Sequence, residues 1–507
     1  MMNNLQKNAF RFYLQTLSPL HIGCNEVYEP TGFVMDAQSK QLLVFDPLAF
    51  IAGLEAEDRK KFSDICRKGT ILSILEIYKF FQGKSAFGRS IYICEDFINH
   101  YTETLSIPLG EEKTIQRELN RFLIERTAFK SNDGRPYLPG SAVKGALRTA
   151  YLNAMAEKKK VPAPKGKGFA RELEKMLLDG GSFETDPFRL VKASDFMPVG
   201  NVKTRVVYAV NEKKVASQYQ ARGPYQILEV IEPGAIFTGQ IRVEQPHSKA
   251  RIRTPVSDGD LHKLSKRFYL KEKQREDEEL KRIGISSLPT ELDDKKESLL
   301  RLGRHSGAES MTISPYRNIR IMTDKGHKSK YLDHATTIWL AAEVRKPTHK
   351  KNLQPFGWVK WEKMTEQQAD EFEQKEFAWL KETEAEALKH QAEIQKQIEK
   401  ERKAAEAVKK RAAEEKQLQQ EKQKKAAELA AMSPEQRDIA ILRDPDVIEN
   451  QVVEIYNKMD NFSEKNKKEL SLALKDYWVD SGKWNKKDCT KKQWKKVQKV
   501  KKILNEF

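Results

Sequence analysis

Apolar residues follow different patterns in successive parts of the 507-residue chain. Short apolar runs separated by turn-forming residues occupy 8–50 and 190–240, and this pattern predicts β-strands. The pattern of residues over 50–130 predicts helices separated by basic loops. A charged stretch over 261–283 predicts another helix. From Thr365 to Ala431 the chain has neither Gly nor Pro and consists mainly of Ala, Glu, Lys and Gln, which predicts one helix of 67 residues.

The first β region is predicted in more detail. An apolar strand over Phe10–Leu17 leads into Pro19. Phe33–Met35 and Leu42–Phe45 are apolar and flank the polar segment Asp36–Gln41, so we expect a β-hairpin there.

The segment Arg135–Tyr151 predicts an extended strand, a turn and a helix. Pro136 and Pro139 prevent an earlier helix start, Gly140 allows a sharp reversal, and Ser141 is a suitable N-cap. The backbone N–H groups at the start of such a helix favour an anion such as phosphate.

Two cations follow on the same predicted helix. Lys144 and Arg148 are four residues apart and therefore neighbours, and like charges at this spacing weaken an isolated helix by roughly 0.2–0.5 kcal/mol. A bridging anion would relieve that repulsion. Gly145 costs about 1 kcal/mol relative to Ala, and such a glycine indicates close approach by another group. A bound anion and a solvated basic edge both fit this pattern.

A glycine pair marks a second candidate loop. In Gly303–Gly307 the two glycines bracket Arg304 and His305, which is the composition of a loop whose backbone approaches phosphate. Lys203 and Arg205 add cations to the second β region.

Several of these motifs resemble a known family. The sequence of Leu138–Ala150, Leu-Pro-Gly-Ser-Ala-Val-Lys-Gly-Ala-Leu-Arg-Thr-Ala, resembles the helix signature of the RAMP superfamily, the ferredoxin-like RNA-binding proteins that build CRISPR effector complexes. Leu17–Gly23 resembles the N-terminal turn of those proteins. Further segments follow in the order seen in the fifth subunit of the type III-A interference complex, the Csm complex: Asp186–Phe188, Val191–Asp195, Arg301–Arg304 and Pro355–Val359.

The resemblance implies an α+β fold of two ferredoxin-like (RRM-like, RAMP) halves, followed by a long α-helix and a small all-α C-terminal domain. The expected domains are a first RAMP domain with a helical insertion over 1–190, a second RAMP region over 191–363, a long charged helix or weak coiled coil over 364–432, and a basic helical domain over 433–507. The likeness ends near residue 360.

The same resemblance implies a non-catalytic subunit that caps and protects the 3′ end of the crRNA and contributes to crRNA maturation and complex assembly. Its implied partners are crRNA, target RNA, other RAMP subunits and the large subunit of the type III-A complex, with host nucleases as further candidates. Motifs and resemblance together give these RNA-binding candidates: His21, Gly23, Gly140, Ser141, Lys144, Gly145, Arg148, Lys203, Arg205, Arg304 and His305. We expect no catalytic residue, no metal site and no cofactor.

Two other functions remain open at the sequence level. One is a RAMP endoribonuclease that processes crRNA precursor or cuts target RNA, with His21 as general acid/base or with Asp133 and a metal ion. No Lys or Arg follows His21 within ten residues to stabilise the departing charge, which weighs against the first version. The other function is a protein-interacting adaptor that acts through the long helix.

Composition narrows the class of partner. A net charge of +18 and a pI near 9.3 favour binding to a polyanion such as nucleic acid. No apolar run long enough to span a bilayer occurs, so we expect a cytoplasmic protein without membrane contact.

The four cysteines are far apart, which predicts buried free thiols rather than a disulfide or a zinc site.

The C-terminal region has a composition of its own. Ser433–Glu435 predicts the N-cap of a new helix, with Pro434 at the first helical position. Aromatic residues over 456–494 are enough for a small helical core, and Ser481–Lys502 holds ten lysines against one acidic residue. We expect a helical mini-domain that binds RNA or a protein; a solubilising tail is the alternative.

Overall fold

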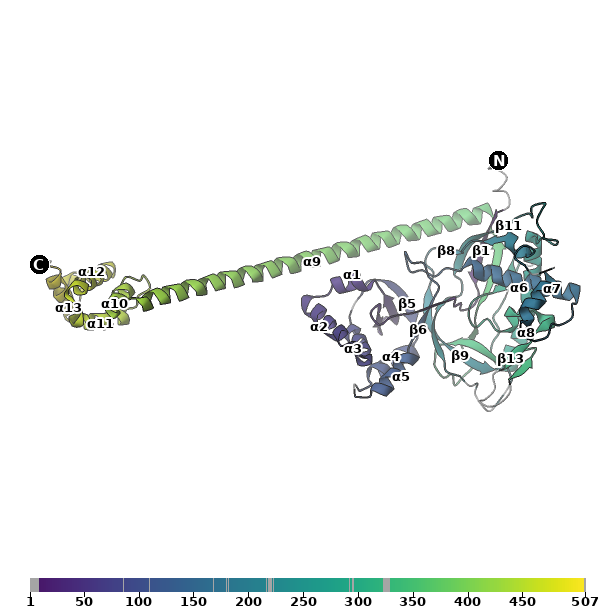
Figure 1. Ribbon diagram of the computed structural model, residues 1–507, viewed down its shortest axis with the longest axis horizontal. Helices are drawn as coiled ribbons and strands as arrows, with labels where there is room; N and C mark the ends of the chain where they lie inside the picture. Colours follow the sequence, from purple (N-terminus) through teal and green to yellow (C-terminus); the bar gives the residue numbers. More distant parts are fainter. Residues whose placement is uncertain are drawn as a thin grey trace. The chain divides into compact units, whose positions relative to one another are not determined.

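The computed structural model describes residues 9–505, except 85, 109, 167, 179, 181, 216, 218–220, 222, 291, 294–295 and 322–328. The chain forms two compact units, Met1–Ile394 and Gln395–Phe507 (Figure 1). The first unit is a mixed α/β structure, and the second consists of helices. This confirms the expected combination of an α/β region with a helical C-terminal region.

Sheet A of the first unit has the strand order β12–β17–β1–β11–β7, with β8 also paired to β11. All of its pairs are antiparallel. Its strands are β1 (Ala9–Thr16), β7 (Val191–Ala193), β8 (Met197–Pro198), β11 (Ile236–Val243), β12 (Ser298–Arg301) and β17 (Trp358–Lys363).

One face of sheet A is covered by helices α6 (Gly140–Lys159) and α8 (Asp258–Arg282). Leu14 of β1 pairs with Phe237 on one side and Trp361 on the other, so these three side chains share a face. They belong to one buried cluster with Val143 of α6 and Phe268 of α8. Apolar residues at alternate strand positions therefore hold the two helices on this face.

Sheet B has the order β2–β6–β10–β9–β5–β4–β3; β15 joins it by pairing with β9, and β16 pairs with β15. Its strands are β2 (Gly23–Val27), β3 (Phe33–Asp36), β4 (Gln41–Val44), β5 (Arg89–Ile93), β6 (Ile124–Thr127), β9 (Thr204–Lys213), β10 (Gln226–Ile231), β15 (Thr337–Ala342) and β16 (Gln354–Pro355). The pairing of β3 with β4 confirms the predicted hairpin.

Five helices follow the hairpin or β5: α1 (Pro47–Ala52), α2 (Ala56–Arg67), α3 (Ile71–Phe81), α4 (Glu95–Leu105) and α5 (Glu112–Arg121). Leu75, Phe97 and Ile115 from α3, α4 and α5 share a core with Tyr208 of sheet B. The remaining elements are α7 (Phe169–Leu177) and the hairpin of β13 (Ile319–Ile321) and β14 (Lys330–Leu332).

Both sheets contain strands from both sides of residue 190. Sheet A joins β1 to β11 and β17, and sheet B joins β6 to β10. The two expected regions, 1–190 and 191–363, therefore share both sheets.

The long helix α9 (Glu366–Ala431) confirms the predicted uninterrupted helix. Its first part belongs to the first unit. Phe372 lies edge-on to Tyr13 of β1, and Glu373 forms an ion pair with Arg11. Tyr13 and Arg11 alternate with the core residues of β1, so α9 lies over the sheet A face opposite α6 and α8.

Arg135 holds the first part of α9 against the rest of the first unit. The two terminal nitrogens of its guanidinium donate to Glu376 at 2.6 and 2.9 Å, and its plane lies 3.6 Å from the ring centre of Trp379. The backbone N–H of Gly200 donates to the same carboxylate at 2.7 Å. Arg135 is only 3% exposed, so this contact is part of the folded core rather than a surface ion pair.

We expect Glu376→Ala to lower the free energy of unfolding of the first unit by about 1–3 kcal/mol, because a buried guanidinium loses one of its two carboxylates. Chemical denaturation followed by tryptophan fluorescence measures this. Glu384→Ala, on an exposed position of the same helix, is the matched control and should change stability by less than about 0.5 kcal/mol. Equal effects of the two substitutions would mean that α9 is not docked through Glu376.

The second unit contains the rest of α9 with α10 (Pro434–Leu442), α11 (Glu449–Asn457), α12 (Glu464–Asp480) and α13 (Lys491–Ile503). The Ser433 hydroxyl accepts from the N–H of Gln436, which confirms the predicted N-cap. The core of the unit includes Leu470, Leu474, Trp478 and Val497. The expected helical C-terminal region is therefore present and has a core of its own.

The four cysteines are free. Cys94 is buried, Cys24 and Cys489 are half-buried, and Cys66 is exposed. The expectation of buried thiols is therefore wrong for Cys66, which lies near the solvent-exposed end of α2. None of the helices that the structure describes is long and apolar enough to cross a bilayer.

Candidate RNA-binding surface

Helix α6 begins at Gly140, with Pro139 as the residue before its first turn. The predicted N-cap role of Ser141 is therefore wrong. The N–H of Gly140 donates to the Asp195 carboxylate at 2.8 Å, so an internal anion occupies this donor. A Cβ at Gly140 would lie 2.4 Å from the carbonyl oxygen of Ser194, so glycine is required there by backbone packing. The structure thus gives Gly140 a packing role beside β7.

The next residues of α6 form an open face. Ser141, Lys144, Gly145 and Arg148 lie on one side of the helix by their spacing, and Ser141 and Gly145 are exposed. A Cβ at Gly145 would meet no atom within 4 Å. Within the described chain nothing fills the space above Gly145, which leaves the helix backbone accessible to an external group.

Arg148 is already paired with carboxylates of the chain. Its guanidinium lies 2.8 Å from Asp186 and 2.9 Å from Glu174. These pairs replace the bridging anion that the sequence suggested, and they raise the pKa of Arg148 against the opposing effect of burial. Arg148 therefore fixes α6 against the segment before β7.

Lys144 is the cation of this face that lacks such a carboxylate. It is half-buried and makes no hydrogen bond or ion pair with the residues that the structure describes. Burial lowers the pKa of Lys144, and the charges of Lys192 on β7 and of Arg148 lower it further, against the opposing charge of Asp186. We call Ser141, Lys144, Gly145, Arg148 and Lys192 the α6 patch.

The sequence did not indicate Lys192 as an RNA-binding candidate, although the segment that contains it, Val191–Asp195, resembles the family. Its signal is a single exposed lysine between the buried Val191 and the half-buried Ala193, which is the outward position of a short strand. Two neighbouring ammonium groups, neither of which forms an ion pair with a described carboxylate, favour an anionic ligand.

The second candidate loop lies elsewhere in the first unit, where three sequence motifs meet. The N–H of Arg304 donates to the carbonyl of His21 at 2.9 Å, and the N–H of Gly357 donates to Pro19 at 2.9 Å. A Cβ at Gly303 would lie 2.3 Å from the His21 oxygen. The glycine is therefore needed for contact between backbone segments, rather than for approach to a phosphate.

His21 lies inside the protein. Its side chain is fully buried, and Nδ1 is 2.8 Å from the carbonyl oxygen of Glu229. Burial lowers the pKa of His21. The expected direct contact between His21 and RNA needs an exposed ring, which this structure does not have; the ring instead joins the turn to β10. Gly23 is exposed at the start of β2.

The other predicted cations are partly neutralised. Arg304 forms an ion pair with Glu125, and Arg205 contacts Gln354 at 3.0 Å and Glu343 at 3.4 Å. Lys203 is exposed directly before β9. Among the described residues, no hydrogen bond or ion pair joins these cations to the α6 patch, so the predicted residues form separate groups.

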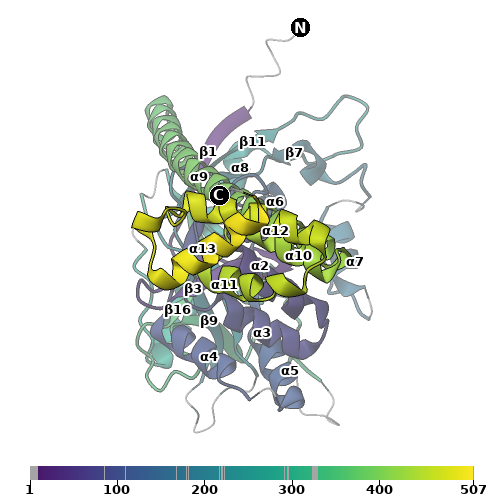
Figure 2. The same ribbon diagram turned by 90° about the vertical axis from the view of Figure 1, so that its left-hand side faces the viewer.

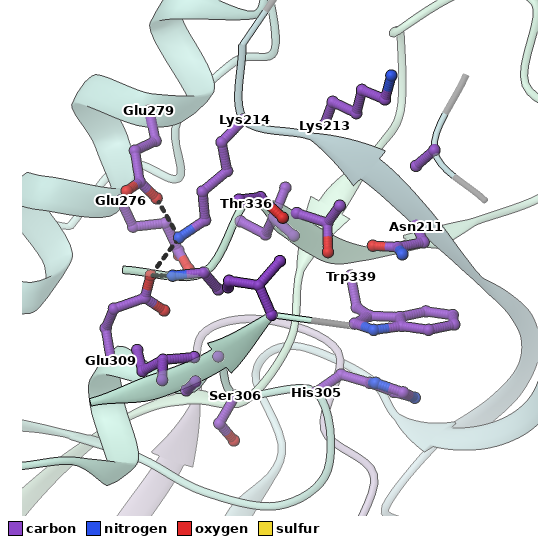
Figure 3. A pocket seen from close by; sticks show the side chains of 18 of the residues that line it. Asn211, Lys213, Lys214, Glu276, Glu279, His305, Ser306, Glu309, Thr336 and Trp339 are labelled. Carbon is purple, nitrogen blue, oxygen red and sulfur yellow. Dashed lines mark hydrogen bonds and ion pairs between the residues drawn. The ribbon is translucent and has the colours of Figure 1, made fainter. Parts of the chain in front are cut away.

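His305 lines a pocket of about 1130 Å³ (Figure 3). Its ring stacks on Trp339 with 4.6 Å between centroids, and Nε2 lies 2.9 Å from the amide oxygen of Gln226. On the opposite wall Lys214 bridges Glu309 and Glu279. Burial would raise the pKa of Glu309, but Lys214 and Arg275 outweigh it and lower the pKa to about 2. The charged groups of this wall therefore compensate one another.

His305 makes the stability of the first unit sensitive to acid. Burial and the nearby Arg304 lower its pKa to about 3 in the folded state, against an unfolded value near 6.5. As the pH falls, the unfolded chain takes up the proton first, so stability is present above about pH 6.5 and is lost between there and pH 3.

We therefore expect the chain to lose about 1–2 kcal/mol between pH 7 and pH 5 through His305. His305→Asn, which tolerates the positive φ of this residue, should show a smaller loss over the same interval. Urea denaturation at the two pH values measures both losses. An identical pH dependence in the variant would contradict a neutral, buried His305.

Asp133, the alternative metal ligand, is committed to ion pairs. Its carboxylate lies 3.0 Å from Lys130 and 3.0 Å from Arg135, and hydrogen bonds and charges from these residues lower its pKa against the effect of burial. In the part of the chain that the structure describes, no three His, Cys, Asp or Glu side chains are grouped as metal ligands.

Comparison with known proteins places the chain in a family. The RAMP superfamily matches residues 13–303, more than half of the chain, and the protein belongs to that superfamily. No curated protein matches it.

Two solved structures are similar to this chain. One is a chain of a cryo-EM structure of a Csm–crRNA–target RNA ternary complex of a type III-A CRISPR–Cas system, with 20% identity and a TM-score of 0.45 over 70% of this chain and 100% of that one. The other is the crystal structure of Csm5 from T. onnurineus, with 19% identity and a TM-score of 0.38 over 68% and 99% of the two chains.

Proposed function

We propose that this protein is a non-catalytic RNA-binding subunit of a type III-A CRISPR effector complex, where it holds and caps the 3′ end of the crRNA. The α6 patch carries the proposal. It places two cations without carboxylate partners, Lys144 and Lys192, beside an exposed glycine on the helix whose sequence resembles the family signature. Such a surface suits the phosphate backbone, which is read by charge and shape rather than by base sequence.

We further propose that sheet A is one ferredoxin-like half. The elements β1, α6, β7, β11, α8 and β17 occur in the order βαββαβ, with other elements inserted between them, and the strands lie side by side as β17–β1–β11–β7. In this arrangement α9 lies over the sheet face opposite the helices, so we place the RNA along α6 and the β7 edge instead.

Two features support a role without RNA cleavage. A general acid/base must reach its substrate, whereas the His21 ring is buried. A metal-binding aspartate needs free oxygens, whereas Asp133 is shared between Lys130 and Arg135. We propose that this subunit sets the 3′ end of the mature crRNA by covering the RNA up to that point. Nucleases supplied by other proteins would then trim the RNA that is not covered.

Exonuclease protection tests the capping role. Effector complexes assembled with and without this chain are treated with a 3′→5′ exoribonuclease, and the crRNA lengths are compared. We expect a defined 3′ end only when the chain is present. Equal trimming in both complexes would overturn the capping role, and cleavage of precursor RNA by the purified chain alone would instead support the ribonuclease alternative.

A further inference from the structure

The second unit has a strongly uneven distribution of charge. Residues 433–480 contain seven basic and eleven acidic residues, whereas Ser481–Lys502 contains ten lysines and one acidic residue, Asp488. Of these ten lysines, only Lys483 and Lys499 form ion pairs with the residues that the structure describes, to Glu449 and Asp460. The fold thus concentrates positive charge on α13 and the turn before it, and acidic residues of the same unit pair with only these two of the ten lysines among the described residues.

Helix α13 arranges part of this charge in a line. Val497 and Val500 are buried on one side of the helix, and Lys491, Lys495, Lys499 and Lys502 are exposed on the opposite side, one turn apart. We call these four residues the lysine stripe. They extend over about 16 Å of helix at 1.5 Å per residue, which corresponds to roughly five nucleotides of a stacked strand.

Aromatic rings lie beside the other lysines of the helix. Lys501 is 5.1 Å from the ring centre of Trp484 and 5.5 Å from that of Trp494, and Lys496 is 5.0 Å from that of Tyr456. All three rings are only partly buried in the core of the unit. Helices α12 and α13 lie side by side (Figure 2), and they share the core that contains Val497 and Val500.

We propose that the lysine stripe is a second RNA-binding site, which binds the phosphate backbone of single-stranded RNA without sequence preference. Evenly spaced cations match an evenly spaced polyanion, and adjacent aromatic rings are the usual stacking partners of unpaired bases. The surface contains lysine and no arginine, which favours charge neutralisation over bidentate base recognition. The site lies in a unit separate from the α6 patch and does not depend on the function proposed for that patch.

The test uses the full-length chain and a labelled oligouridylate of about 20 nucleotides, with the salt dependence of binding as the readout. Lys491→Gln/Lys495→Gln/Lys502→Gln should weaken binding roughly 10- to 100-fold at 0.1 M salt and lower the salt slope by about 2, because each lost phosphate contact in a single strand contributes about 0.7. The Lys499–Asp460 pair stays intact in this variant.

Two further variants make the result specific. Lys409→Gln/Lys410→Gln/Lys416→Gln removes the same charge from exposed positions of α9 and should bind almost as the wild type does. Lys491→Arg/Lys495→Arg/Lys502→Arg keeps the charge and should retain the salt slope. The three glutamine substitutions should also weaken RNA binding in a chain that carries Lys144→Glu/Lys192→Glu. This result would show that the lysine stripe acts independently of the α6 patch.

An unchanged affinity and salt slope in the glutamine variant would overturn the proposal and leave an acidic protein surface or solubility as the role of the stripe. An equal loss in the α9 control would also overturn it, because general charge would then explain the binding. Circular dichroism and thermal unfolding of each variant confirm that the second unit is folded.

Discussion

Glu276→Ala is expected to lower the free energy of unfolding of the first unit by about 3–5 kcal/mol. Glu276 on α8 and Arg301 on β12 form an ion pair in which both side chains are almost completely buried, at 2% and 0% exposure. Glu276 also accepts from the indole N–H of Trp358 at 2.6 Å. Alanine would leave a charged guanidinium in the core without its carboxylate, which costs far more than the loss of a surface pair.

Chemical denaturation of the first unit measures this effect against two further variants. Glu278→Ala, on the exposed side of the same helix, should change the free energy of unfolding by less than about 0.5 kcal/mol. Glu276→Leu combined with Arg301→Met removes both charges and should recover part of the lost stability. A loss below about 1 kcal/mol for Glu276→Ala would contradict the buried ion pair.

Lys144→Glu/Lys192→Glu is expected to have the largest effect on RNA binding. The double substitution replaces two cations of the α6 patch by anions, so that the phosphate backbone meets repulsion where it met attraction. We expect the affinity of the purified chain for a crRNA-length RNA to fall by at least about 30-fold at 0.15 M salt, with a salt slope lower by about 1.4.

Filter binding over a salt series measures both quantities. The matched control is Lys60→Glu/Lys61→Glu, which makes the same change in charge at two exposed positions of α2 and should reduce affinity only slightly. Arg148 is left unchanged, because its pairs with Asp186 and Glu174 make a structural loss indistinguishable from a binding loss. Equal losses in the two double variants would show that the α6 patch is not a specific contact.

Local patterns predicted several elements of this fold correctly. The run without Gly or Pro became α9, the Ser-Pro pair became the start of α10, and the two apolar runs around Asp36–Gln41 became a hairpin. Each of these features depends on residues close together in the sequence, where helix propensity, capping and strand alternation act. The sequences of Leu138–Ala150 and Leu17–Gly23 likewise indicated the RAMP superfamily, which the comparison confirmed.

The features that were missed depend on residues far apart in the sequence. The anion at the start of α6 comes from Asp195, 55 residues after Gly140. The acceptor that holds His21 belongs to Glu229, 208 residues away, and the carboxylate beside Arg135 belongs to Glu376, 241 residues away. A single sequence contains no signal for such pairings, because polar residues at turns look the same whether their ligand is internal or external.

Glycines illustrate the same limit. In the sequence, Gly140 predicted a sharp reversal, Gly145 indicated close approach by another group, and Gly303 belonged to a loop expected to approach phosphate. In the structure, Gly140 and Gly303 are packed against carbonyl oxygens of the chain itself, and only Gly145 of these three faces open space. The informative feature is therefore Lys144, the cation next to Gly145 that forms no ion pair with a described carboxylate. Such a feature can be recognised only when the fold is known.

We propose that this chain holds the 3′ end of the crRNA through the α6 patch. The most direct measurement is to purify the chain with its co-expressed CRISPR operon, extract the bound RNA and sequence its 3′ ends, for the wild type and for Lys144→Glu/Lys192→Glu. We predict crRNA with a defined 3′ end in the wild type, and lost or ragged RNA in the variant. A wild-type chain that carries no crRNA and joins no CRISPR subunit would contradict the account, and crRNA with the same defined 3′ ends in the variant would contradict the role of the α6 patch.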